Sequence, residues 1–336
     1  MGRSSVSAVL VVAVLLLSVL AAAVLVLPRR QPSFTTTYTV TTGVPPPYPV
    51  GYGVTMTEAS YDNINQHSFA SLTADLAMLA STHAQALRVD IGYDAWLNGN
   101  LTDQSEISSL IAAARQDGMA VIIADASAEY YRSHPLPWNQ FEAAWVQRVT
   151  TLASLYHPDY YIVIKEPGWY PPMISGFYFD PGYSSGPWLS LLSQLVTAVR
   201  SASPQTQVGV SVDAGTGMTN HPAFYQQFLT GAESMGVFIG FDIYDQGAMA
   251  NTQDFLQSHP PTVPVWIAET WDGSTPTCSS ADAGWLTQME GFTLAHHISW
   301  LVPFFTDCFS SNPPLFTQYT SSYYTFQEFA KFGTAN

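Results

Sequence analysis

Two glutamates in this sequence each close an apolar run and are followed by aromatic residues. Glu166 ends the run "YIVIKE" and precedes Pro-Gly-Trp-Tyr, whereas Glu269 ends "VPVWIAE" and precedes Thr-Trp. Carboxyl groups in such positions can transfer protons to a substrate or attack it as nucleophiles. Both reactions require that the fold hold the two side chains close to one reacting bond.

The residues after position 49 show a repeating pattern of apolar runs. Short runs rich in Val and Ile, typical of strands buried on both faces, alternate with stretches in which apolar residues recur at helical spacing. The predicted strands are Val50–Thr55, Ala86–Ile91, Met119–Asp125, Tyr160–Glu166, Gln207–Asp213, Val237–Tyr244, Val263–Glu269 and His297–Phe304. The predicted helices span residues 72–80, 107–114, 141–155, 188–202, 222–235 and 281–293. This alternation predicts an α/β protein, a (β/α)₈ TIM barrel over residues 50–336.

The alternative architecture is a doubly wound open sheet. Such a sheet would need a Gly-rich phosphate-binding turn near its first strand, and the segment "GYGVTM" does not supply one. In the favoured barrel, Glu166 and Glu269 end the fourth and seventh strands, which lie on facing parts of one rim. Two carboxyl groups that converge there, with a sugar ring between them, are what glycoside hydrolysis requires.

Five segments then resemble motifs of clan A of the glycoside hydrolases, retaining (β/α)₈ enzymes that include cellulases, mannanases and β-galactosidases. The segments are "LRVDIGYDAW", "VIKEPGWY", "FDIYDQ", "VWIAETW" and "ISWLVPF". The resemblance implies that Glu166 is the acid/base and Glu269 the nucleophile of β-glycosidic bond cleavage. It also implies that Arg88 and Tyr244 lie beside the nucleophile and that Trp300 forms a sugar platform. No single family within the clan is indicated.

One residue departs from the clan's pattern. The clan usually has Asn before the acid/base Glu, where it binds the sugar 2-hydroxyl, and this chain has Lys165, one of its two lysines. Lys165 could donate to a substrate hydroxyl or pair with Asp125 or Asp213. We expect it to lower the pKa of Glu166, which suits an enzyme with an acidic rate optimum. The alternative is a barrel that has lost catalysis and serves in carbohydrate binding or the cell envelope.

Further residues are candidates for substrate binding. Trp169 and Trp271 follow the two candidate catalytic glutamates, and their ring faces could stack on a sugar. Arg88 could hold Glu269 ionised, or it could form a structural ion pair with Asp90.

The N-terminal residues predict a tether. All 22 residues from Val6 to Leu27 are Val, Leu, Ala or Ser, which is long enough for a membrane-spanning helix. We therefore expect residues 1–30 to be a signal-anchor or a signal peptide, and residues 31–49, rich in Thr and Pro, to be a linker. The barrel is expected to be extracellular, either secreted or anchored to the membrane by the N-terminal helix.

The charge and residue composition of the chain limit the classes of molecule that it could bind. The formal net charge of −15 argues against nucleic acid, because phosphate binding needs a basic surface. Carbohydrate is the expected substrate, and we expect a monomer without cofactor or metal. The adjacent His296 and His297 cannot easily chelate one ion. Cys278 and Cys308 are expected to form a disulfide, since an exported protein favours that state.

Overall fold

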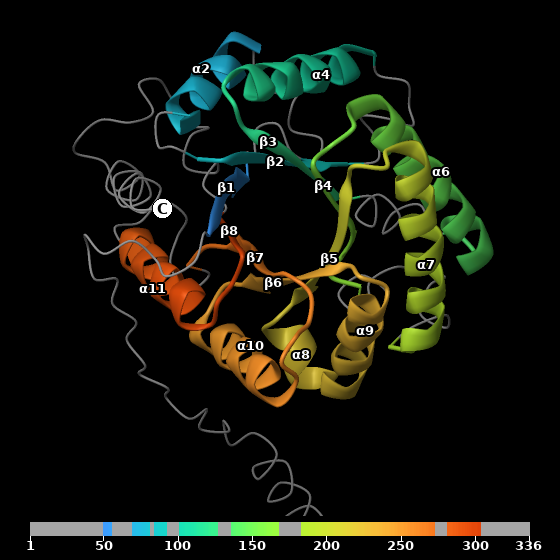
Figure 1. Cartoon of the computed structure of the whole chain (residues 1–336), viewed down its shortest axis with the longest axis vertical. Coiled ribbons are helices and arrows are strands. Elements are labelled where there is room, and N and C mark those ends of the chain that lie inside the picture. The colour runs from blue at the N-terminus through green and yellow to red at the C-terminus, as the bar shows by residue number, and fades with distance from the viewer. Residues whose placement is uncertain are drawn as a thin grey trace, which may run out of the picture. The chain divides into compact units, whose positions relative to one another are not determined.

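The computed structural model describes residues 50–55, 69–80, 84–92, 101–126, 136–167, 183–272 and 281–303. These residues form a closed barrel of parallel strands arranged in chain order, with the helices outside the ring (Figure 1). The strands are β1 (Gly51–Thr55), β2 (Ala86–Ile91), β3 (Ala120–Asp125), β4 (Tyr160–Lys165), β5 (Gln207–Asp213), β6 (Phe238–Ile243), β7 (Val265–Thr270) and β8 (Trp300–Pro303). The predicted (β/α)₈ barrel is confirmed.

The helices occupy the segments between the strands. They are α2 (Phe69–Ala80), α4 (Leu101–Gln116), α6 (Trp138–Tyr156), α7 (Ser185–Ala202), α8 (Thr216–Asn220), α9 (Pro222–Ser234), α10 (Gln246–Ser258) and α11 (Ala281–Ala295). The short α8 and the longer α10 were not predicted. In α10 the buried side chains are few, namely Ala248, Met249, Thr252 and Phe255, so its apolar pattern in the sequence is weak.

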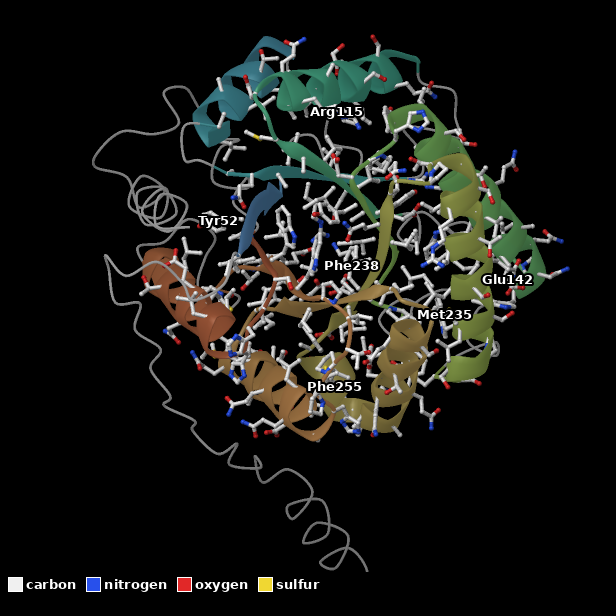
Figure 2. The ribbon with its side chains drawn as sticks, in the orientation of Figure 1. Tyr52, Arg115, Glu142, Met235, Phe238 and Phe255 are labelled. Atoms are coloured by element: carbon white, nitrogen blue, oxygen red, sulfur yellow. The ribbon has the colours of Figure 1, made fainter. Side chains whose placement is uncertain are left out.

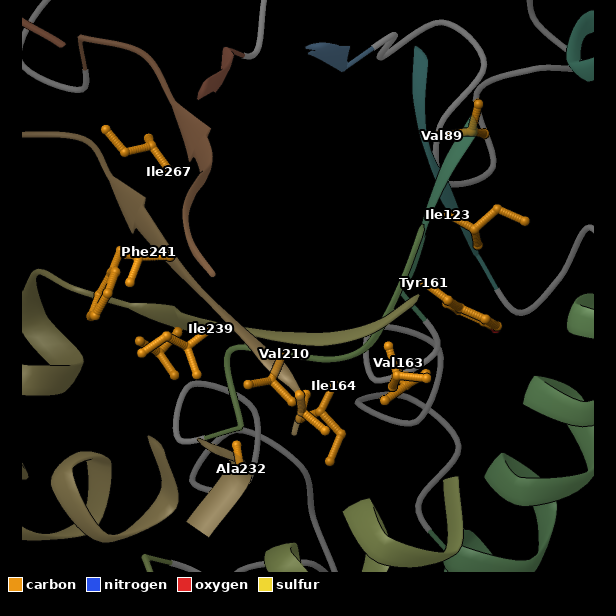
Figure 3. Packing of buried hydrophobic residues seen from close by; sticks show 14 of the residues in the cluster. Val89, Ile123, Tyr161, Val163, Ile164, Val210, Ala232, Ile239, Phe241 and Ile267 are labelled. Atoms are coloured by element: carbon orange, nitrogen blue, oxygen red, sulfur yellow. The ribbon is translucent and has the colours of Figure 1, made fainter. Parts of the chain in front are cut away.

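Strand residues alternate between the two sides of the barrel wall. Val89, Ile123, Tyr161 and Val210 point away from the ring toward the surrounding helices, where they join the larger hydrophobic core (Figure 3). A smaller, separate cluster fills the inside of the ring. Both sides of every strand are therefore covered, which explains why the strands read as nearly continuous apolar runs.

An aromatic layer fills the N-terminal end of the barrel interior. Its members are Tyr160, Phe238, Trp266 and Trp300, and Phe238 is visible inside the ring in Figure 2. The rings of Phe238 and Trp266 are stacked with centroids 4.1 Å apart, and the Trp266 and Trp300 centroids are 5.2 Å apart. Small residues on neighbouring strands make room for these rings, because a Cβ added at Gly209 would lie 1.9 Å from the Phe238 ring.

The barrel interior becomes polar toward the C-terminal ends of the strands. Above the aromatic layer lie the aliphatic side chains of Ile122 and Ile162. Beyond these come Arg88, Ser211 and Asp242, all completely buried. Buried polar groups are stable only when they are paired or neutral, so this end of the barrel is where specific chemistry has to be sought.

Several expectations fall outside the described residues. They are the N-terminal segment 1–30, the linker 31–49, Trp169, and the two cysteines Cys278 and Cys308. None of the helices within the described ranges has the length and apolar character needed to cross a membrane. The anchor and the disulfide stay predictions.

The fit between Gly209 and Phe238 can be tested by stability. We expect Gly209→Ala to lower the free energy of unfolding by about 1–3 kcal/mol, because the added methyl overpacks the aromatic layer. Gly284→Ala is the matched control, since a Cβ at this position in α11 meets no atom within 4 Å. Urea unfolding of both variants measures the difference. Equal effects of the two substitutions would contradict the tight packing described here.

Candidate active site

Strand β4 has one extra residue, Val163, between two consecutive pairing positions with its neighbour β5. Ile162 is paired with Gly209 and Ile164 with Val210, so the strand bulges between them. As a result Val163 and Ile164 both face the outer core (Figure 3). Lys165, which follows, turns into the barrel interior, whereas strict alternation would have directed it outward.

Strand β7 also contains a bulge. Phe241 of β6 pairs with Ile267, and the next residue, Asp242, pairs with Glu269, so Ala268 is the extra residue. Ala268 belongs to the inner cluster, and Glu269 also faces inward, where its carboxylate meets Arg88. The Arg88 guanidinium donates to the carbonyl oxygen of Ala268. Among the strand pairings that the structure describes, the bulges thus lie in β7, which contains Glu269, and in β4, which Glu166 follows directly.

Glu166 has an unusual backbone conformation. Its φ is 48°, in the left-handed region that residues other than glycine rarely adopt. The Glu166 amide donates to the carbonyl oxygen of Ser211 on β5 at 2.8 Å, which fixes the conformation. Backbone strain of this kind is concentrated at functional sites, where the surrounding structure maintains it.

Three donors hold the carboxylate of Glu269. Arg88 Nη2 lies 2.8 Å and Lys165 Nζ 2.7 Å from the same atom, Oε2. The Tyr244 hydroxyl donates to the other oxygen, Oε1, at 2.7 Å. The structure therefore brings together Glu269, Arg88 and Tyr244, and it adds Lys165 to this group.

Asp90 completes the charged cluster. It accepts from Arg88 Nε at 2.7 Å and from Arg88 Nη2 at 2.8 Å, and its Oδ2 lies 3.0 Å from Lys165 Nζ. Burial alone would raise the pKa of Asp90, but Arg88 and Lys165 together hold it below its ordinary value. Both alternatives considered for Arg88 are thus present at once, because it pairs with Asp90 and with Glu269.

The carboxylates first considered as partners of Lys165 are engaged elsewhere. Asp125 faces the outer core and pairs with Arg148 Nε of α6 at 3.0 Å. Asp213 accepts from the amides of Gly215 and Gly217, each at 2.8 Å, at the start of α8. Of the two possibilities considered for Lys165, pairing with a carboxylate occurs, but with Asp90 and Glu269 instead of Asp125 or Asp213. Asp125 is excluded because alternation along β3 turns it outward.

The pKa of Glu166 shifts in the direction opposite to the one expected. Burial raises the pKa of Glu166 to about 8; Lys165 and Arg88 lower it, while Glu269 and Asp213 raise it further. Lys165 does lower this pKa, as expected, but desolvation outweighs the ammonium group, so the net shift is upward. Glu166 is therefore a protonated acid at neutral pH, near the paired carboxylate of Glu269.

Asp242 is a further carboxyl group in the site that sequence reasoning did not assign. Its Oδ2 accepts from Ser211 Oγ at 2.9 Å, and its Oδ1 has no hydrogen-bond partner among the described residues. Burial, together with the charges of Glu269 and Glu166, raises the pKa of Asp242 well above its ordinary value. Asp242 precedes Tyr244 by two residues, and this strand-period spacing was the available signal.

The charges of the site balance. Arg88 and Lys165 supply two positive charges, and the carboxylates of Asp90 and Glu269 offset them. In the described part of the chain no group of His, Cys, Asp and Glu side chains could hold a metal ion.

The tryptophans predicted to bind sugar differ in position. Trp300 is the first residue of β8 and belongs to the aromatic layer at the N-terminal end of the barrel. It cannot form a platform at the opposite end, so that expectation is wrong. The expected strand began at His297, and the observed strand begins three residues later. Trp271 does lie beside the site, with its ring centroid 4.1 Å from that of Tyr244.

Comparison with known proteins identifies a shared fold. No protein-family model matches the chain, and no curated protein matches it. Among solved structures, the endo-1,4-β-mannanase from Rhizomucor miehei is similar at 10% identity and a TM-score of 0.58, covering 80% of this chain and 89% of that one. A family 1 β-glucosidase from Thermotoga maritima is similar at 11% identity and a TM-score of 0.57, covering 77% and 89%.

A third similar structure is that of a fungal β-1,4-galactanase. It is 14% identical with a TM-score of 0.56, and the match covers 83% of this chain and 99% of that chain. At these identities the similarity establishes the fold. That fold is a (β/α)₈ barrel, and no family is assigned.

The neutral state of Asp242 predicts a pH dependence of stability. A carboxyl group whose pKa rises on folding stabilises the protein below its unfolded pKa of about 4 and loses that contribution as pH increases. We therefore expect Asp242→Asn to become more stable relative to the unmodified protein as pH rises above about 4, by up to about 1.4 kcal/mol per pH unit.

Urea unfolding between pH 5 and pH 8 measures this difference. Asp254→Asn, at an exposed position in α10, is the control for removing a carboxyl group at the surface. A flat profile for Asp242→Asn would mean that Asp242 ionises in the folded protein as readily as in the unfolded chain.

Proposed function

We propose that this protein is a glycoside hydrolase that cleaves β-glycosidic bonds with retention of anomeric configuration. The observation that carries the proposal is the contrast between its two glutamates. Glu269 is a carboxylate held by Arg88, Lys165 and Tyr244, while burial keeps Glu166 protonated. One group is prepared to attack and the other to donate a proton. The mannanase, glucosidase and galactanase with similar barrels support this choice.

The reaction proceeds in two steps. Glu269 attacks the anomeric carbon while Glu166 gives its proton to the departing glycosidic oxygen, which leaves a glycosyl ester on Glu269. Glu166, now ionised, takes a proton from water, the water oxygen bonds to the anomeric carbon, and the Glu269 carboxylate departs. The electrostatic influence of Glu269 on Glu166 supports their cooperation.

The proposed substrates are uncharged β-linked saccharides. The chain as a whole carries a formal net charge of −15. Polysaccharides rich in uronate or sulfate would be repelled by this field. We propose that the enzyme acts as a monomer outside the cell, secreted or tethered through residues 1–30, as the N-terminal sequence predicts.

Substitution of the two glutamates tests the function. With an unactivated β-linked oligosaccharide, we expect Glu166→Gln to lower kcat/KM by about 10²–10⁴-fold, because the leaving oxygen receives no proton. With an aryl glycoside whose phenolate leaves readily, the loss in the first step should be much smaller. Glu269→Gln should abolish turnover of both substrates, whereas Glu106→Gln in α4 should leave it unchanged.

The anomeric product, followed by proton NMR, distinguishes the mechanisms. A β-anomer released first supports retention, and an α-anomer would require inversion by the same pair. If the protein binds saccharides but Glu269→Gln hydrolyses them no more slowly than the unmodified protein, the chain is a carbohydrate-binding barrel without catalysis.

The raised pKa of Glu166 predicts the alkaline limb of the rate profile. A general acid acts in its protonated form, so activity should persist through neutral pH and fall as pH rises past about 8. The alkaline limb of the rate profile is therefore expected at higher pH than the acidic optimum predicted from the sequence. The dependence of kcat/KM on pH, measured with an unactivated oligosaccharide, tests it. An alkaline limb near pH 5 would contradict the raised pKa.

A further inference from the structure

The ammonium group of Lys165 contacts Glu269, the proposed nucleophile, where the clan usually has an asparagine. We infer that Lys165 is a positioning residue that stabilises Glu269 as a departing carboxylate and so accelerates hydrolysis of the glycosyl ester. This inference rests on the proposed function and concerns the second of its two steps.

The two oxygens of Glu269 are held differently. Oε2 lies 2.8 Å from Arg88 Nη2 and 2.7 Å from Lys165 Nζ, so two cations share it. Within the described part of the chain, Oε1 accepts a hydrogen bond from the neutral Tyr244 hydroxyl, at 2.7 Å. Two positive charges beside Oε2 stabilise the negative charge on that oxygen and reduce its nucleophilicity more than one neutral hydroxyl does at Oε1. The geometry therefore makes Oε1 the attacking atom.

This assignment gives Oε2 a defined role in the second step. When Oε1 is bonded to the anomeric carbon, Oε2 is the carbonyl oxygen of the ester, and both cations remain directed at it. As water attacks, the bond between Oε1 and the anomeric carbon breaks and its electron pair returns to the carboxylate. Fixed cations beside Oε2 stabilise the charge that develops there. In the first step the same cations stabilise the free carboxylate and slow its attack.

The surroundings keep Lys165 in this position. Its ammonium group also lies 3.0 Å from Asp90 Oδ2, and Asp90 is fixed in turn by two bonds from Arg88. The lysine is only 4% exposed. Its contacts with Asp90 and Glu269 involve two of the three ammonium N–H groups, and moving the ammonium group away from these carboxylates would leave uncompensated buried charge, which is strongly unfavourable. The contacts thus favour a role toward Glu269 over the direct substrate binding first expected.

Lys165→Met removes the charge while keeping a long side chain, and Lys165→Asn introduces the neutral amide usual in the clan. With a dinitrophenyl β-glycoside, whose first step needs no proton, we expect a burst of phenolate followed by a steady state slowed about tenfold or more. We expect kcat/KM to stay within about threefold or to increase, because the first step no longer opposes the ammonium charge. Arg200→Met, in α7, controls for loss of a cation far from the site.

The burst also guards against misfolding, because only folded enzyme forms the glycosyl ester. Mass spectrometry should locate that ester on Glu269 in the Lys165 variants. If kcat and kcat/KM fall together without a burst, Lys165 assists the first step or merely the fold, and the inference is overturned. Failure of the proposed function looks different, since the unmodified protein would then release no phenolate above the level of Glu269→Gln.

Discussion

Compensation of charge inside the barrel is the constraint on which the site depends. Arg88 and Lys165 are withdrawn from water, and each is stable there only because carboxylates within 3.0 Å offset it. The cluster links strands β2, β4 and β7, so its members reach one another only in the closed barrel. The bulges in β4 and β7 are part of the same requirement, because without them Lys165 and Glu269 would face the outer core.

The same environment gives two glutamates opposite properties. Both are buried at the C-terminal end of the barrel, yet Glu269 has two cations on one oxygen, whereas desolvation dominates at Glu166. Burial likewise raises the pKa of Asp242, whose side chain accepts a hydrogen bond from the neutral Ser211 hydroxyl. Within the described residues the two cations form ion pairs with Asp90 and Glu269, whereas burial raises the pKa of Glu166 and of Asp242 despite the more distant influence of the same cations.

The sequence predicted the architecture well because buried parallel strands leave a strong pattern of apolar runs. It also indicated Glu166 and Glu269 as strand-end residues, and the resemblance to clan A motifs added Arg88 and Tyr244. The structure places Arg88 and Tyr244 in contact with Glu269. The sequence did not show which side of the barrel wall the residues after a bulge face, because one extra residue in a strand reverses the direction of every later side chain. Trp300 shows a related limit, because a three-residue error in a strand start moves a side chain to the other end of the barrel. The pKa of Glu166 depended on burial, which a sequence does not display.

Packing and proton chemistry occupy different parts of the barrel interior, because the aromatic layer lies at its N-terminal end and the charged cluster toward its C-terminal end. Tyr160, Phe238, Trp266 and Trp300 make packing contacts with one another, and aliphatic residues lie between them and the charged cluster. Substitutions that do not share neighbours tend to have additive effects. Evolution or an engineer could therefore exchange the rings at the base to adjust thermal tolerance while the proton chemistry at the rim stays untouched.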